Sequence, residues 1–82
     1  MNNEIIYFYA PLCPKCVRVN QWLKKLKETN PNLRIIKYNI IRNGEKTKQF
    51  NIKTIPTVII NEEKLTGWID KENFDKAIKK IK

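Results

Sequence analysis

The chain contains only two cysteines, and they lie two residues apart in the segment Cys13-Pro14-Lys15-Cys16. An apolar run precedes this segment and a helical pattern follows it, which predicts Cys13 at a helix N-terminus with Pro14 at the first helical position. Unpaired backbone N–H groups, the helix dipole and the Lys15 ammonium all favour the thiolate form of a thiol placed there. Cys16, one turn further along, is expected to face the protein interior. The pair therefore predicts an exposed nucleophile with a sheltered resolving thiol, the arrangement needed for thiol–disulfide exchange.

Seven elements are predicted around this pair from apolar runs and helical spacings. In order they are a strand at 5–9, a helix at 14–28, a strand at 33–40, a short helix at 45–50, strands at 57–60 and 64–68, and a helix capped by Asp70. The first run is apolar throughout, as is typical of a central strand buried on both faces. The strand, helix and strand that come first imply a right-handed parallel crossover, and the third and fourth strands a β-hairpin. The predicted fold class is α/β, a four-stranded mixed sheet flanked by three helices in the order βαβ, α, ββα.

The last helix has a clear apolar face. Phe74, Ala77, Ile78 and Ile81 follow one another at helical spacing, so this helix can cover the sheet. With 82 residues the chain is predicted to form a single domain over residues 1–82.

The composition is basic, with 17 Lys and Arg against 8 Asp and Glu and a net charge of +9. Many of the lysines close helices, where cations complement the helix dipole, so we interpret them as a solvated surface. A nucleic-acid footprint is the alternative.

Residues 1–4 lack a basic segment and the apolar run after them is short, so neither a signal peptide nor a membrane span is predicted, and a cytoplasmic location is expected. In a reducing compartment a Cys-x-x-Cys pair is more often catalytic or metal-binding than structural.

A second motif, Thr-Ile-Pro-Thr at 54–57, opens the third predicted strand. Together with Cys-Pro-x-Cys at the first strand-to-helix junction, it makes nearly the whole chain resemble the thioredoxin and glutaredoxin superfamily. The resemblance implies the thioredoxin fold and a cis Ile55–Pro56 bond packed beside the cysteines. A cis proline exposes the preceding backbone for pairing with an extended substrate. A trans proline that opens an edge strand is the alternative.

The resemblance also implies the residues around the cysteines. Ile55 and Pro56 would form the substrate ledge, Gly67 would allow close approach, and Trp68 would lie at the rim, a packing role being the alternative for Trp68. Pro14 and Lys15 would support the nucleophile. Lys37 would support the site from the second strand, with an ordinary solvent-exposed strand lysine as the alternative.

The sequence combines features of two branches of the superfamily. The Ala-Pro-x-Cys segment, Lys37-x-Asn39 and Ile-Pro-Thr look like thioredoxin, whereas the length, Pro14 and the short 56–67 hairpin look like glutaredoxin. Thioredoxins carry Trp and a buried Asp where this chain has Leu12 and Tyr7, so their route for deprotonating the resolving cysteine is not expected here.

Glutathione recognition is predicted to be poor. Glutathione-binding glutaredoxins usually have a basic residue where this chain has Ala10, and of their Gly-Gly and acidic pattern near the last helix only Gly67 and Asp70 fit. The chain thus resembles small redoxins with a thioredoxin-like site on a glutaredoxin-sized frame. The resemblance implies a monomer that binds no cofactor, reduces disulfide-containing proteins and receives electrons from an NADPH-linked thioredoxin reductase, with glutathione as the alternative donor. No nucleic-acid or membrane partner is expected.

Three other roles are open to the cysteines. Two thiolates supply half of a tetrahedral zinc site, and with no His and no further Cys the other ligands would have to come from carboxylates or a second chain, so no metal is expected. A structural disulfide closing so short a loop would stabilise the fold by only about 2 kcal/mol. A basic nucleic-acid- or protein-binding module would carry the thiols without using them.

Overall fold

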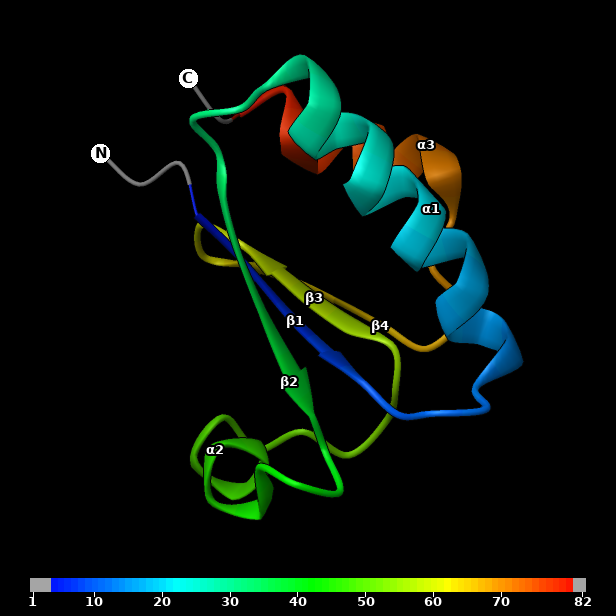
Figure 1. Ribbon diagram of the computed structural model, residues 1–82, viewed down its shortest axis with the longest axis vertical. Coiled ribbons are helices and arrows are strands. Elements are labelled where there is room, and N and C mark those ends of the chain that lie inside the picture. Colours follow the sequence, from blue (N-terminus) through cyan, green and yellow to red (C-terminus); the bar gives the residue numbers. More distant parts are fainter. Residues whose placement is uncertain (1–3, 81–82) are drawn as a thin grey trace.

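The computed structural model describes residues 4–80, and seven elements follow one another along them (Figure 1). They are β1 (Glu4–Tyr9), α1 (Pro14–Thr29), β2 (Arg34–Asn39), α2 (Gly44–Gln49), β3 (Thr57–Ile60), β4 (Glu63–Thr66) and α3 (Lys71–Ile78). The strands form one sheet in the order β2-β1-β3-β4. β1 pairs in parallel with β2 and antiparallel with β3, and β3 pairs antiparallel with β4. The predicted order of elements and the mixed four-stranded sheet are confirmed.

The central place of β1 follows from its sequence, because a strand with neighbours on both sides and layers on both faces must be apolar throughout. Ile5, Tyr7 and Phe8 are fully buried. Ile5 and Tyr7 belong to the main core cluster together with Val19, Leu23 and other residues of the helical layer. In Figure 1, α1 and α3 lie together over one face of the sheet, so this cluster fills the space between them and the strands.

The opposite face carries a smaller aromatic group. The Phe8 ring lies 5.2 Å from the Tyr38 ring and 5.4 Å from the Phe50 ring, measured between centroids. Phe50 is the C-terminal cap of α2, which is drawn away from α1 and α3 near the end of β2 (Figure 1). The alternation along β1 thus places Tyr7 towards α1 and Phe8 towards α2.

The fourth strand was predicted to reach Trp68, and this is wrong by two residues, since β4 ends at Thr66. Gly67 adopts a positive φ of 70°, which a strand does not allow, and its N–H donates to the Pro56 carbonyl at 3.0 Å. Asp70 occupies the N-cap position of α3 as predicted, although its side chain makes no capping hydrogen bond. Ile81 lies outside the described residues.

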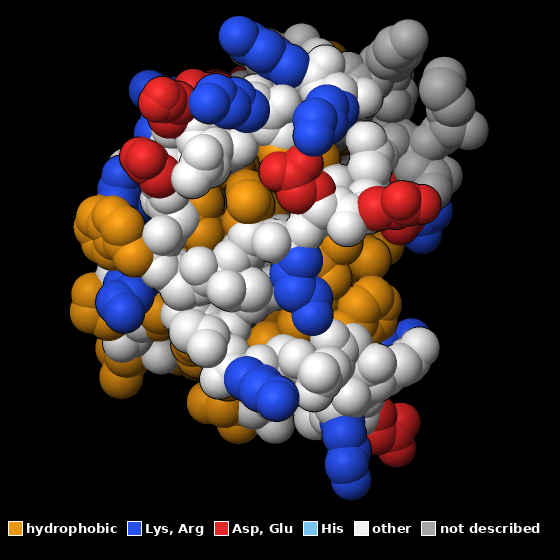
Figure 2. Space-filling model, turned by 180° about the vertical axis from the view of Figure 1, so that it is seen from behind, with side chains coloured by type: hydrophobic (Ala, Val, Ile, Leu, Met, Phe, Trp, Pro, Cys, Tyr) orange, Lys and Arg blue, Asp and Glu red, His pale blue; other side chains and the backbone are white. Residues whose placement is uncertain are grey.

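Charged side chains are spread over the surface. Figure 2 shows Lys and Arg side chains scattered over one face, with Asp and Glu among them, rather than gathered into one patch. Within residues 4–80, no helix has the length and apolar character needed to cross a membrane.

Candidate active site

Cys13 occupies the N-cap of α1 with an extended backbone (φ −100°, ψ 107°), and Pro14 follows as the first helical residue. The Cys13 side chain is half-buried, whereas Pro14 and Lys15 are exposed. No acidic side chain lies in the first turn of α1, so the positive end of the helix dipole and the Lys15 charge act on this thiol without an opposing carboxylate there. The N-terminal placement predicted from the spacing is confirmed.

Cys16 lies one turn further along, with only 2% of its surface exposed, and its N–H donates to the Cys13 carbonyl at 3.0 Å. Both cysteines are free thiols. Burial raises the pKa of Cys16, and a hydrogen bond with the Cys13 thiol raises it further, while hydrogen bonds from the Ala10 backbone and the Tyr7 hydroxyl lower it in part. Cys16 is therefore the sheltered partner that the sequence predicts, and burial makes its thiol less acidic than an ordinary one.

Tyr7 lies directly beneath Cys16. Its side chain is fully buried, its ring stacks on that of Tyr9 at 5.5 Å, and its hydroxyl donates to the Cys16 carbonyl at 3.2 Å. Burial raises the Tyr7 pKa far above that of an ordinary phenol, and the nearby Cys16 adds to the effect. Tyr7 therefore stays a neutral hydrogen-bond donor and cannot act as a base at neutral pH.

The loop before β3 carries the second predicted motif of the site. The Ile55–Pro56 peptide bond is cis, with Pro56 buried and Ile55 half-buried. Gly67 is tied to this loop by its hydrogen bond to the Pro56 carbonyl. A methyl group at Gly67 would meet only Thr54 Cγ2 at 3.8 Å, so the positive φ, rather than lack of space, accounts for a glycine here.

The comparisons with known proteins agree with this geometry. A family model described as thioredoxin matches residues 2–82. The chain belongs to the thioredoxin family. It is 29% identical to a thioredoxin of Methanocaldococcus jannaschii over 79 residues, which cover 94% of this chain and 93% of that protein.

Two further relatives are longer than this chain. A thioredoxin of Listeria monocytogenes is 30% identical over 79 residues, covering 89% of this chain and 77% of that protein. The solved structure of mitochondrial thioredoxin 3 from Saccharomyces cerevisiae superposes with a TM-score of 0.80 at 25% identity, covering 96% of this chain and 79% of the other. As a thioredoxin-family protein with a Cys-x-x-Cys pair at the N-terminus of α1, the chain is a thiol–disulfide oxidoreductase.

Lys37 and Trp68 are the remaining residues that the sequence predicts for the site. Lys37 is exposed on β2, one of the two edge strands, and lies in register with Tyr7 of β1. Trp68 is 64% exposed, so it does not belong to the core. Leu12 is fully exposed and Val17 half-exposed, and both border a shallow hollow of about 390 Å³ that the two cysteines also line. The immediate surroundings of Cys13 are thus open and largely apolar on this side.

One charged residue near the cysteines was not singled out from the sequence. Arg18 lies two residues after Cys16, and its guanidinium carbon lies 4.2 Å from the Trp68 ring centroid and 4.9 Å from that of Trp22. The spacing of Arg18 and Trp22, four residues apart on a helix, was an available signal for the second contact. The first joins residues fifty positions apart, and only the fold reveals it.

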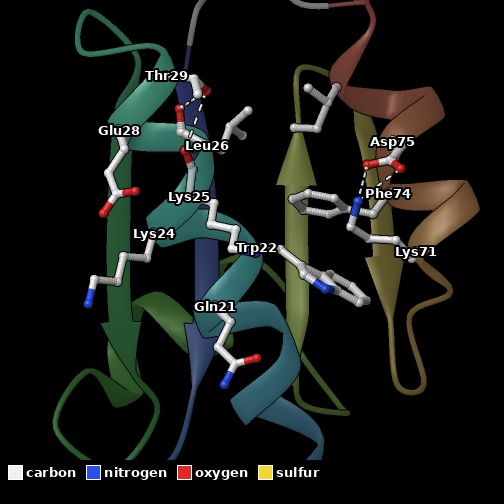
Figure 3. Close-up of a pocket in the computed structure, with 11 residues that line it drawn as sticks. Gln21, Trp22, Lys24, Lys25, Leu26, Glu28, Thr29, Lys71, Phe74 and Asp75 are labelled. Atoms are coloured by element: carbon white, nitrogen blue, oxygen red, sulfur yellow. Dashed lines mark hydrogen bonds and ion pairs between the residues drawn. The ribbon is translucent and has the colours of Figure 1, made fainter.

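A larger hollow of about 790 Å³ lies between α1 and α3, away from the cysteines. Figure 3 shows Trp22 of α1 and Phe74 of α3 meeting there, with ring centroids 5.2 Å apart, and the Lys71–Asp75 ion pair beside them. Lys24 and Glu28 extend from α1 on the other side of the view. Trp22 therefore belongs both to this groove and to the stack on Arg18.

Proposed function

We propose that this protein reduces disulfides in other proteins, with Cys13 as the attacking nucleophile and Cys16 as the resolving thiol. The observation that carries the proposal is the contrast between a half-buried Cys13 at the α1 N-terminus and a buried Cys16 whose pKa is raised by burial. The first thiol is open to a target, whereas burial shields the second from direct attack.

The exchange proceeds in two balanced steps. The Cys13 thiolate attacks one sulfur of the target disulfide, a Cys13–target bond forms, and the other target sulfur leaves as a thiolate and takes a proton. Cys16 then loses its proton and attacks the Cys13 sulfur, which forms the Cys13–Cys16 disulfide and releases the second target thiol. Two electrons have moved from this protein to the target, and the reaction requires no bound cofactor.

Tyr7 acts in the second step. Thioredoxins use a buried carboxylate to deprotonate the resolving cysteine, and a neutral phenol cannot replace that base. The Tyr7 hydroxyl can instead donate a hydrogen bond to the charge that develops on the Cys16 sulfur. This interaction lowers the Cys16 pKa and so opposes the effect of burial. Solvent or the departing target thiolate would then accept the proton.

The target would lie across the open surface around Cys13. We propose that Ile55 and Pro56 pair with an extended segment of the target, with Gly67 leaving room for its backbone. The exposed apolar side chains of Leu12 and Val17 give this surface a place for apolar target residues.

We further propose that an NADPH-linked reductase of the thioredoxin reductase type recharges the disulfide, in the reducing cytoplasm. Ala10 offers no charge to a glutathione carboxylate at the position where glutaredoxins usually have one. Lys71 lies in the region where glutathione-binding glutaredoxins usually have acidic residues, and it forms an ion pair with Asp75. These features favour a protein donor over glutathione, which remains the second candidate.

The test is NADPH-coupled reduction of a protein disulfide, run in parallel with a thioredoxin reductase and with glutathione plus its reductase. Turnover with the first system alone is expected. Turnover with the glutathione system alone would assign the protein to the glutaredoxin branch. Absence of turnover in either system, with intact and reduced thiols, would refute the proposed donors. The Cys13→Ser variant is the blank for each arm.

A further inference from the structure

The flank of the active site that faces α3 carries an arginine between two tryptophans. The Arg18 guanidinium packs against Trp68 at 4.2 Å and Trp22 at 4.9 Å, distances at which a cation is attracted to the face of an indole ring. These contacts hold the guanidinium in place while leaving the N–H groups at its edge available. Arg18 is itself only partly exposed, as expected for a side chain that packs against two indole rings.

The charge of Arg18 has no matching carboxylate in residues 4–80. Lys71, whose ammonium lies 5.9 Å from the Trp22 centroid, provides the comparison, because it forms an ion pair with Asp75 at 2.8 Å. Figure 3 shows this pair beside Trp22. Across the described part of the chain no ion pair or side-chain hydrogen bond involves Arg18, although its planar fork of donors is suited to bidentate contact with a carboxylate.

The position of Arg18 relative to the cysteines suggests what it binds. Pro14, next to Cys13, precedes Arg18 by four residues, so the two share one face of α1 about 6 Å apart. Trp68 follows Gly67, which is hydrogen-bonded to the Pro56 carbonyl. A target segment lying over Cys13 and Pro56 would therefore extend towards Arg18 within one or two residues of its own cysteine.

We propose that Arg18, held between Trp22 and Trp68, is a binding site for a carboxylate of the target protein and selects disulfides flanked by Asp or Glu. The proposal rests on the thiol–disulfide exchange proposed above and names a substrate preference for it. The net charge of +9 acts in the same direction over longer distances, by attracting acidic partners, but only the fixed guanidinium would select a carboxylate at one place in the sequence.

The test uses protein that has been reduced chemically and freed of reductant, so no reductase is involved. Two disulfide peptides are compared, one with Glu and one with Gln at the positions two residues before and after the cysteine. Each peptide is mixed in excess over the reduced protein, and the second-order rate constant of its reduction is measured. We expect wild-type protein to prefer the Glu peptide about fivefold at moderate salt. The preference should fall below about twofold in Arg18→Gln, with little change in the rate for the Gln peptide.

Arg34→Gln is the matched control, because it removes the same charge from an exposed side chain at the opposite end of the sheet from Cys13. It should keep the preference. A ratio near one in wild-type protein, or an unchanged ratio in folded Arg18→Gln, would overturn the inference. If Arg18→Gln does not fold, Arg18→Lys replaces it, and a preference retained in full by Lys would likewise count against the guanidinium. Failure to reduce the Gln peptide at all would instead contradict the exchange reaction itself.

Discussion

Replacing Tyr7 by Phe removes one buried hydroxyl and leaves the ring in place. That hydroxyl has one proton, which it donates to the Cys16 carbonyl at 3.2 Å, and by turning this proton towards the sulfur it would lower the pKa of Cys16. A neutral hydrogen bond contributes about 0.5–1.5 kcal/mol to stability, which corresponds to a loss of a few degrees in Tm for a domain of this size. A hydrogen bond to a charged group contributes about 1.5–3 kcal/mol. Because a proton turned towards the sulfur gives up its bond to the carbonyl, we take the lower end, which is about tenfold in the rate of the resolving step.

The assay separates the two steps of exchange. Reduced protein is mixed with the coloured aromatic disulfide dithiobis(nitrobenzoate), which releases one coloured thiolate when Cys13 attacks and a second when Cys16 resolves the adduct. We expect the first, concentration-dependent phase to be unchanged in Tyr7→Phe and the second, concentration-independent phase to be about tenfold slower at pH 7. The difference should shrink as the pH rises, because Cys16 is then ionised in both proteins.

Tyr9→Phe is the matched control. Tyr9 stacks on the same ring at 5.5 Å, and no hydrogen bond of its hydroxyl is present among residues 4–80, so both phases should match wild type. The role assigned to the Tyr7 hydroxyl is refuted if Tyr7→Phe resolves its adduct at the wild-type rate, or if it slows the first phase instead of the second.

Other predictions concern stability, measured by denaturant unfolding of the reduced protein. Gly67→Ala should cost about 1–2 kcal/mol because φ is 70°, whereas Gly44→Ala, with nothing within 4 Å of the added methyl, should be neutral or slightly stabilising. Phe74→Ala should cost about 3–5 kcal/mol, because the ring is 2% exposed and packs on Trp22. Stability should fall as the pH rises above about 8.5, where Cys16 ionises in the unfolded chain but burial keeps it protonated in the folded one. A flat profile from pH 7 to 10 would contradict that last assignment.

The β1–α1 junction could be predicted from the sequence because its determinants are local. An apolar strand, a helical repeat and Pro14 at the first helical position are enough to place Cys13 at the N-cap and to turn Cys16 inward. The end of β4 could not be predicted in the same way. The segment through Trp68 has strand-forming residues, and β4 stops two residues earlier because Gly67 adopts a positive φ of 70° and Pro56, opposite it, has no N–H to continue the ladder; only the pairing of the two strands reveals this.

The stack on Arg18 was beyond sequence reasoning for the same reason. Its two indoles come from α1 and from the loop after β4, and nothing near Trp68 in the chain indicates that it meets the helix. Tyr7 is a different case. Its place in an apolar strand predicts a buried ring, but the direction of its hydroxyl depends on how α1 crosses the sheet.

Trapping the mixed disulfide tests most directly whether Cys13 is the nucleophile and Cys16 the resolving thiol. Cys16→Ser protein, reduced and then incubated with a disulfide-containing protein, should accumulate a covalent adduct that reductant releases and that peptide mapping by mass spectrometry locates at Cys13. Cys13→Ser protein should form little adduct under the same conditions, because Cys16 is 2% exposed. An adduct that maps to Cys16 in wild-type protein, or Cys16→Ser protein that turns over as fast as wild type without accumulating an adduct, would contradict the assignment of nucleophile and resolving thiol.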